Sequence, residues 1–392
     1  MKRVHTGLDN LVSAPPPWLE GKRLGLLCNP ASVDSRLVNA KDIIHKQYGP
    51  GLKALFSPQH GLYAEKQDNM IESGDFIDPA LKIPVFSLYG VTRRPTAEMM
   101  DMIDVLIVDL LDVGTRVYTF FTTLSYCLEE AGRTGKTILV LDRPNPIGGV
   151  QVEGNCLDPA YTSFVGRYPI PMRHGLTIGE YAGYINTHFG IGCDLNVIAM
   201  QGWQRRMYYR DTGLFWVAPS PNLPTPESAM VYPGQVIWEG TNISEGRGTT
   251  QPFELFGAPF LDMDKILSSV GGQRLPGCIL RPALFEPTAN KWKDAACSGF
   301  QIHVTDTSRF RPYETSLKLL AAVIFHHGGR FEWKQPPYEY EFETLPIDLI
   351  IGDSEIRQAI EAGPDNINDI LEPGRPDMDA FIESTRPFRI YE

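Results

Sequence analysis

The feature that most constrains this chain is a repeated pattern in which a short apolar run ends in a cluster of polar residues. The clusters are Pro58–Gly61 after the run Leu52–Ser57, then Asp109, Asp112, Arg116 and Tyr118 after Val105–Val108, and Asp142–Pro146 after Thr137–Leu141. In an open α/β sheet, parallel strands end at one edge, and ligands bind outside those carboxyl ends. We therefore expect the clusters to share one site, although any single cluster could instead be a satisfied turn.

The spacing between the apolar runs predicts a parallel sheet. Short apolar runs bounded by Gly, Pro, Asn or Asp are typical of buried strands, and here they alternate with segments of helical length. The predicted strands are Arg23–Cys28, Leu52–Phe56, Val85–Leu88, Val105–Val108 and Thr137–Leu141, and the predicted helices are Ser35–Tyr48, Thr96–Met102 and Phe120–Gly132. This alternation favours an α/β fold with right-handed crossovers.

The pattern becomes less regular beyond Gly148. Thr177 and Glu180 form a capping-box pattern that predicts a helix to His188. The stretch 216–259 is rich in Pro and Gly and predicts a long irregular region. Further strands are predicted at Asp194–Met200 and Gly299–Thr305, and further helices at Tyr313–His326, Asp365–Leu371 and Met378–Thr385. We expect one domain at 1–270 and a smaller α+β domain at 271–392.

Charge and composition exclude several classes of function. The 392 residues carry a formal net charge of −11 without a Lys/Arg run, which argues against a nucleic-acid partner. No apolar stretch is long enough to span a membrane, and residues 1–7 contain no apolar signal core, so we expect a cytoplasmic protein. The six cysteines form no Cys-x-x-Cys pair and are predicted to be reduced, structural thiols.

The common cofactor motifs are missing from the sequence. No G-x-G-x-x-G follows the first predicted strand, whose turn is Cys28–Ser32, and there is no G-x-x-x-x-G-K-[ST], G-x-S-x-G or H-E-x-x-H. Asp109 and Asp112 without a third carboxylate are weak metal ligands, and an Asp at such a place more often caps a helix or pairs with an arginine such as Arg116. We therefore expect no metal and no other cofactor.

The densest polar segment of the chain is Glu239–Thr250. Glu239 and Glu245 could supply acid–base chemistry, and Arg247 could bind a carboxylate through two hydrogen bonds. The glycines of the segment would allow its backbone to approach a ligand closely. Equally, the segment could be a loop that internal Glu–Arg pairing holds together.

Other polar turns could add binding groups. Prolines flank Arg143 and Asn145, and a similar turn contains Asn222, so these side chains are either aimed at a ligand or part of stiff turns. His60 is either a ligand-binding residue or a hydrogen-bonded structural one. Together with the aromatic residues of the chain, this inventory fits a carbohydrate better than a phosphate ester.

At these residues the chain resembles the NamZ-type exo-β-N-acetylmuramidases, long known as a domain of unknown function. The matching segments run in order along nearly the whole chain: Phe56–Gly61, Ser87–Gly90, Asp109–Thr119, Leu141–Gly149, Arg173–Gly175 with Thr177 and Glu180, Pro219–Pro224, Glu239–Thr250 and Gly299–Asp306. The resemblance implies a Rossmann-like N-terminal domain, a smaller C-terminal domain and a cleft between them. It also implies release of terminal N-acetylmuramic acid from peptidoglycan fragments, as in muropeptide recycling. The lactyl carboxylate of that sugar would suit an arginine clamp.

One position departs from the family pattern. The family usually has Glu-His-Gly where this chain has Gln59–Gly61. The resemblance implies that this Glu is the catalytic carboxylate, and an amide cannot be the general acid that glycoside cleavage requires. Glu239 or Glu245, or as third choice Glu65, would then have to carry the proton. The alternative is a non-catalytic sugar-binding or regulatory protein on a disabled hydrolase scaffold.

Overall fold

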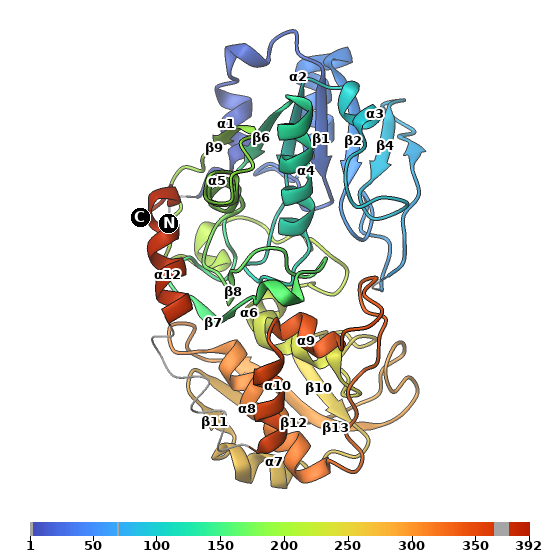
Figure 1. Cartoon of the computed structure of the whole chain (residues 1–392), viewed down its shortest axis with the longest axis vertical. Helices are drawn as coiled ribbons and strands as arrows, with labels where there is room; N and C mark the ends of the chain where they lie inside the picture. Colours follow the sequence, from blue (N-terminus) through green and yellow to red (C-terminus); the bar gives the residue numbers. More distant parts are fainter. Residues whose placement is uncertain (1–2, 69, 364–375) are drawn as a thin grey trace.

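A seven-stranded sheet forms the centre of the N-terminal half of the molecule (Figure 1). The computed structural model describes residues 3–68, 70–363 and 376–392. The strand order is β3 (Phe76–Ile77), β4 (Pro84–Ser87), β2 (Leu52–Ser57), β1 (Leu24–Cys28), β5 (Val105–Asp109), β6 (Thr137–Leu141) and β9 (Asp194–Ile198). All neighbouring pairs are parallel except β3 with β4. The predicted parallel sheet is confirmed.

Helices cover both faces of this sheet because its strands are apolar on both sides. One set of strand residues packs against α1 (Gly7–Ser13) and α2 (Ala40–Tyr48), and the alternate set packs against α3 (Ala97–Asp101), α4 (Phe120–Thr134) and α5 (Ile178–His188). In β1, for example, Leu26 belongs to the first set and Leu27 to the second. Such two-sided burial is typical of parallel strands joined by helical crossovers.

The C-terminal half has its own sheet. The four strands are antiparallel, in the order β10 (Leu255–Ala258), β13 (Cys297–Val304), β12 (Cys278–Phe285) and β11 (Arg274–Leu275). Its helices are α6 (Pro226–Gln235), α7 (Met263–Val270), α8 (Pro312–His327), α9 (Pro346–Ile351) and α10 (Ser354–Ala362). Helix α6 packs on α8 and β10 pairs with β13, so elements before residue 271 take part in the packing of this half.

The stretch 216–259 is more regular than the sequence predicts. It contains α6 and a following 3-10 helix, η5 (Val236–Gly240). Thr225 caps α6 and Pro226 occupies its first turn, where proline is tolerated, while Pro233 lies inside the helix. The Pro and Gly content therefore hid a helix that tertiary packing stabilises. The predicted helix Asp365–Leu371 lies outside the described residues.

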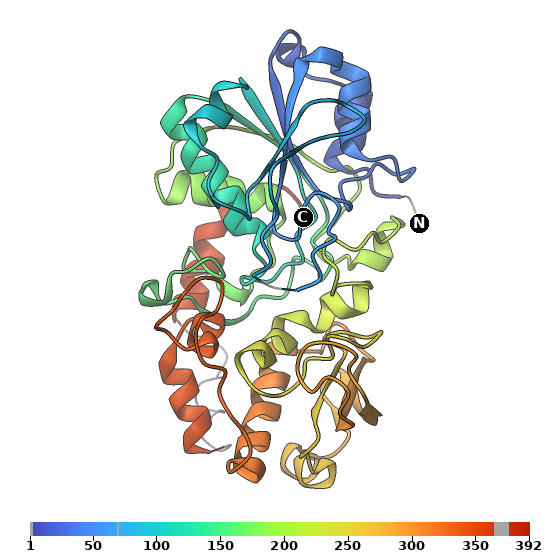
Figure 2. The same ribbon diagram turned by 90° about the vertical axis from the view of Figure 1, so that its right-hand side faces the viewer.

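The last described segment returns to the N-terminal half. Helix α12 (Pro376–Thr385) packs against β7 (Glu153–Cys156), which pairs with β8 (Pro171–Arg173). Near the C-terminus, Tyr391 donates a hydrogen bond of 2.5 Å to Asp142 after β6. The C-terminal segment of the chain thus packs back onto the N-terminal half (Figures 1 and 2).

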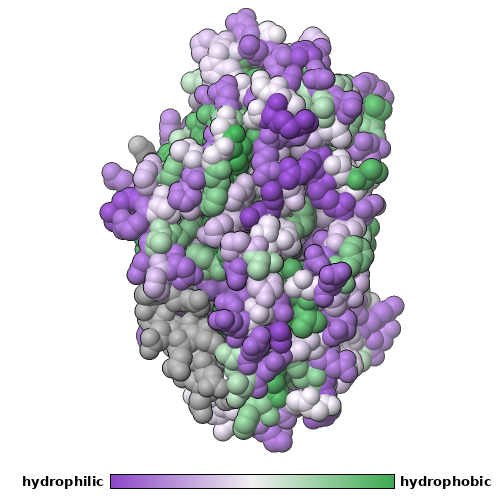
Figure 3. All heavy atoms as spheres, viewed as in Figure 1, coloured by the Kyte–Doolittle hydropathy of each residue, from purple (hydrophilic) through white to green (hydrophobic). Residues whose placement is uncertain are grey.

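The surface in Figure 3 mixes hydrophilic and hydrophobic side chains, and the green residues are dispersed among the purple ones. Among the described residues, no helix has both the length and the apolar character needed to cross a bilayer. All six cysteines are free thiols, and five of them are buried.

Candidate active site

The carboxyl edge of the parallel sheet supplies one side of a pocket. Gln59 and His60 follow β2, and Tyr118 and Thr119 lie in the loop between β5 and α4. His60 has a φ of 74°, in the left-handed region that residues other than glycine seldom adopt. The tight turn after β2 therefore costs backbone strain, which is a common feature of functional sites.

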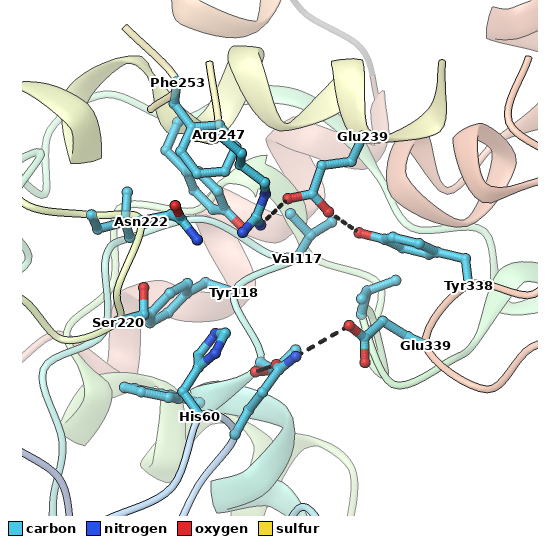
Figure 4. A pocket seen from close by; sticks show the side chains of 16 residues that line it. His60, Val117, Tyr118, Ser220, Asn222, Glu239, Arg247, Phe253, Tyr338 and Glu339 are labelled. Carbon is cyan, nitrogen blue, oxygen red and sulfur yellow. Dashed lines mark hydrogen bonds and ion pairs between the residues drawn. The ribbon is translucent and has the colours of Figure 1, made fainter. Parts of the chain in front are cut away.

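The C-terminal half supplies the other side of the same pocket. Glu239 comes from η5, Arg247 from the segment after it, and Tyr338 and Glu339 from the loop before α9. Figure 4 shows these side chains facing His60 and Asn222 across a shared space. The pocket therefore exists only where the two halves meet.

Arg247 is the centre of a buried charge cluster. Its Nη2 donates to Glu239 over 2.6 Å, and its Nε lies 3.1 Å from Glu245. Glu245 also accepts a hydrogen bond of 2.8 Å from Lys291, and Glu239 accepts one of 2.7 Å from Tyr338. Two cations thus balance two carboxylates. The segment thus has the internal Glu–Arg pairing that was one of the two alternatives predicted from the sequence. Arg247 and Glu239 also line the pocket, so the pairing does not remove them from the site.

Glu239 is held in its ionised form. Burial opposes ionisation, but the charge of Arg247 and the hydrogen bonds from Arg247 and Tyr338 outweigh it, so the pKa of Glu239 is lowered. A carboxylate in this state can accept a proton or stabilise positive charge, but it is a poor proton donor near neutral pH.

Glu339 has the opposite environment. It is 5% exposed, and it accepts hydrogen bonds from Gln59 over 3.1 Å and from Tyr89 over 2.6 Å. No salt bridge to Glu339 occurs among the described residues. Burial raises its pKa to about 7, and the negative charge of Glu239 acts in the same direction. Protonated Glu339 is therefore accessible near neutral pH, unlike protonated Glu239.

His60 is a neutral residue in this site. Burial lowers the pKa of its imidazole to about 4. Its Nδ1 lies 2.7 Å from the carbonyl oxygen of Lys66, which can only accept, so Nδ1 carries the hydrogen. The other ring nitrogen, Nε2, is then a hydrogen-bond acceptor.

The pocket is narrow inside and opens into a larger groove. Within an empty volume of about 470 Å³ that includes open solvent, the pocket leaves only about 30 Å³ for water. The adjacent outer groove has a volume of about 930 Å³ and shares Asn222 and Arg247 with the pocket. Gln67, Thr249 and Asn290 also line the outer groove.

Two glycines shape the segment that carries Arg247. Gly246 and Gly248 both have a φ of 79°. A side-chain carbon at Gly246 would lie 2.7 Å from the carbonyl oxygen of Leu255, and one at Gly248 would lie 2.5 Å from the backbone of Ala289. These glycines are therefore required by close packing within the chain, rather than only by the ligand approach that we expected.

The structure brings together half of the residues that the sequence singled out. The pocket is lined by Gln59, His60, Tyr118, Asn222, Glu239 and Arg247. Glu245 lies behind Arg247 and does not line the pocket, and Glu65 is exposed outside it. Neither position suits a proton donor for a ligand in this pocket.

Four predicted binding residues lie elsewhere, which corrects the expectation of a single cleft for all clusters. Asp109 accepts two hydrogen bonds from Arg143, of 2.5 and 2.8 Å. Arg116 donates to four backbone carbonyl groups. Asn145 closes its own turn through the amide of Ile147 and the carbonyl of Leu176. The polar groups of these four residues form hydrogen bonds within the protein, which is the structural role that the sequence left open as an alternative to ligand binding.

Asp112 also has a structural role, because it accepts a hydrogen bond of 2.7 Å from the backbone of Gly114. Within the described ranges, no group of three or more His, Cys, Asp or Glu side chains is arranged to hold a metal ion.

Sequence reasoning missed Glu339, Tyr338 and Tyr89. Glu339 lies in a stretch where aromatic and acidic residues alternate up to Glu343. Regular alternation would place all its glutamates on one solvent-facing side. Positive φ values at Glu339 (47°) and Tyr340 (68°) break the alternation and turn this one glutamate inward. No local signal distinguishes it from its neighbours.

Comparison with known proteins identifies the family. The sequence model of the exo-β-N-acetylmuramidase NamZ N-terminal domain matches residues 24–227, and that of the C-terminal domain matches residues 230–391. The chain belongs to the NamZ family. The first model ends and the second begins within α6.

Relatives of known name or structure cover the full chain. A protein of Bacillus subtilis (strain 168) named peptidoglycan β-N-acetylmuramidase NamZ is 42% identical over 390 residues, 99% of this chain and 92% of that protein. Crystal structures of two DUF1343 family proteins from Bacteroides fragilis align with TM-scores of 0.89 and 0.73, at 34% and 26% identity. Each alignment covers 100% of this chain and 99% of the other.

Proposed function

We propose that the chain is a glycoside hydrolase that releases a terminal N-acetylmuramic-acid-type sugar from peptidoglycan fragments. The observation that carries this proposal is one pocket with two buried carboxyl groups in opposite environments. Glu239 is ionised beside Arg247, whereas burial between Gln59 and Tyr89 raises the pKa of Glu339 to about 7. Glycosidases use one carboxylate and one protonated carboxyl group on either side of the scissile bond.

The shape of the site supports action at a chain end. The outer groove is wide and shares Asn222 and Arg247 with the pocket, so a fragment can lie in the groove with its terminal sugar at the mouth of the pocket. The name of the Bacillus subtilis relative supports peptidoglycan as the source of the fragment. Arg247 lines both spaces and is the cation that a lactyl carboxylate would meet, although Glu239 and Glu245 already engage its guanidinium group.

Hydrolysis of paired substrates tests the proposal. The purified full chain is incubated with a chromogenic β-glycoside of N-acetylmuramic acid and with its N-acetylglucosamine counterpart, and the released sugar is identified by mass. We expect turnover of the first substrate in preference to the second, and strong loss of turnover in Glu239→Gln. Glu343→Gln, at an exposed position of the loop that carries Glu339, is the matched control and should keep full activity.

A second candidate function rests on Gln59. If wild type binds the muramic-acid glycoside without turnover and Gln59→Glu gains turnover, the chain is a sugar-binding protein on a disabled scaffold. The cytoplasmic location also stays a proposal, which fractionation of cells that express the full-length natural protein would test.

A further inference from the structure

Glu339 is placed to replace the carboxyl group that the chain lacks at position 59. Gln59 and Glu339 are separated by 280 positions in sequence, but their side chains are in direct contact, with 3.1 Å between the amide nitrogen and a carboxyl oxygen. Both line the same pocket. The carboxyl group missing after β2 is thus matched by one that approaches the same place from the C-terminal half.

The three buried glutamates around the pocket differ in their partners. Glu239 and Glu245 each pair with Arg247, and Glu245 also pairs with Lys291. Glu339 instead accepts hydrogen bonds from a neutral amide and a neutral phenol. The nearby Arg93 lies over the rings of Tyr89 and Tyr340. Of the three, Glu339 is the carboxyl group that can hold a proton at neutral pH and release it on demand.

The backbone at Glu339 is strained, as is common at functional sites. Glu339 and the following Tyr340 both have positive φ, at 47° and 68°, although neither is a glycine. Non-glycine residues in this region carry strain of about 1–3 kcal/mol each and are concentrated at functional sites. Here the strain turns the carboxyl group of Glu339 into the pocket rather than toward solvent.

We infer that Glu339 is the general acid that protonates the leaving-group oxygen, and that Gln59 is a positioning residue that orients it. This inference rests on the proposed glycosidase function. In the step, the O–H bond of Glu339 breaks and its proton bonds to the glycosidic oxygen, while the electron pair of the C1–O bond leaves with that oxygen. Water then supplies a hydroxyl group to C1 and a proton that restores the Glu339 carboxyl group.

An amide at position 59 suits this arrangement better than a carboxylate. The hydroxyl group of Thr119 donates to the carbonyl oxygen of Gln59 over 2.6 Å, which fixes the amide so that its N–H points at Glu339. This N–H and the hydroxyl group of Tyr89 stabilise the carboxylate that forms after proton transfer. A glutamate at position 59 would place two carboxyl groups in contact, where both cannot be ionised.

The leaving group decides whether Glu339 has this role. Wild type, Glu339→Gln and the control Glu343→Gln are compared on the disaccharide of N-acetylmuramic acid with N-acetylglucosamine and on the dinitrophenyl β-glycoside of N-acetylmuramic acid. The sugar leaving group needs a proton and the dinitrophenolate does not. We expect Glu339→Gln to lower kcat/KM on the disaccharide by about 10²–10⁴-fold, and to leave the dinitrophenyl substrate within about tenfold of wild type.

The pH profile separates catalysis from structure. In wild type, kcat/KM on the disaccharide should fall above about pH 7 as Glu339 loses its proton. Gln59→Leu removes a donor to the carboxylate form and should move this limb to higher pH, whereas a merely structural role of Gln59 would leave the limb in place. Thermal unfolding shows whether each variant is folded.

Each remaining outcome has a distinct meaning. Equal losses on both substrates in folded Glu339→Gln, or no loss on the disaccharide, would overturn the role of Glu339 and leave the proposed function standing. No turnover of either substrate by wild type would overturn both.

Discussion

Removal of Arg247 should leave the buried carboxylate of Glu239 without the cation that pairs with it. Arg247 and Glu239 have side chains that are 9% and 5% exposed, and their contact is 2.6 Å. Breaking a buried ion pair by removal of one partner typically costs about 3–5 kcal/mol. We expect Arg247→Met to lower the free energy of unfolding by that amount, because Glu239 would lose the cation that pairs with it while keeping the hydrogen bond from the hydroxyl group of Tyr338. Glu245 keeps its partner Lys291.

The loss should depend on pH in a defined direction. In wild type the folded-state pKa of Glu239 lies below its ordinary value of 4.5, so its stabilising effect is present above that value and is lost as pH falls. Without Arg247, burial should raise the folded-state pKa above the unfolded one. The variant would then lose stability as pH rises, and its deficit relative to wild type should be larger at about pH 8 than at about pH 5.

Urea unfolding at these two pH values, followed by circular dichroism, measures the deficit. The double variant Arg247→Met with Glu239→Gln should recover about 0.5–3 kcal/mol relative to the sum of the two single variants. Additive effects, or a deficit that does not grow with pH, would refute the reasoning.

Three further outcomes follow from the geometry. NMR of the His60 ring should show a neutral imidazole with hydrogen on Nδ1, protonated only near pH 4. Because burial lowers the folded-state pKa of His60 below its unfolded value, the protein should lose stability as pH falls from about 6.5 toward 4. Gly246→Ala should reduce both stability and kcat, because the added carbon would lie 2.7 Å from the carbonyl oxygen of Leu255. The control Gly271→Ala should cost less, since Gly271 has a similar φ of 83° but no atom within 4 Å of the added carbon, and equal melting temperatures of the two variants would contradict this. Asp109→Asn should weaken the buried pair with Arg143 and lower the unfolding midpoint, while KM stays within about twofold because neither residue lines the pocket.

The fold could be predicted from the sequence where the signals are local. The apolar runs that became β1, β2, β4, β5 and β6 are bounded by turn residues, and each lies within a residue or two of its predicted position. The capping box at Thr177 and Glu180 is confirmed, because its two hydrogen bonds involve residues only three positions apart. Helix α6 was missed because its Pro and Gly residues are tolerated only through packing on α8.

The site could be predicted only in part, because strand-end polar clusters have two possible uses. Gln59, His60 and Tyr118 line the pocket, but Asp109 and Arg143 pair with each other and do not line it. Both uses give the same sequence pattern, since a buried polar group must find a partner whether or not a ligand binds nearby. Only the three-dimensional arrangement shows which groups satisfy the chain and which remain directed at a cavity.

The position of Glu339 couples its protonation to the contact between the two halves. Its carboxyl group comes from the C-terminal half, whereas Gln59 and Tyr89, which bury and bind it, follow strands of the N-terminal sheet. If the halves separated enough to hydrate Glu339, its pKa would fall from about 7 toward the ordinary 4.5, and the group would be ionised at neutral pH. A general acid in this position therefore holds its proton at neutral pH only while both halves bury it. The contact between the halves that forms the pocket also keeps solvent away from the proton of Glu339.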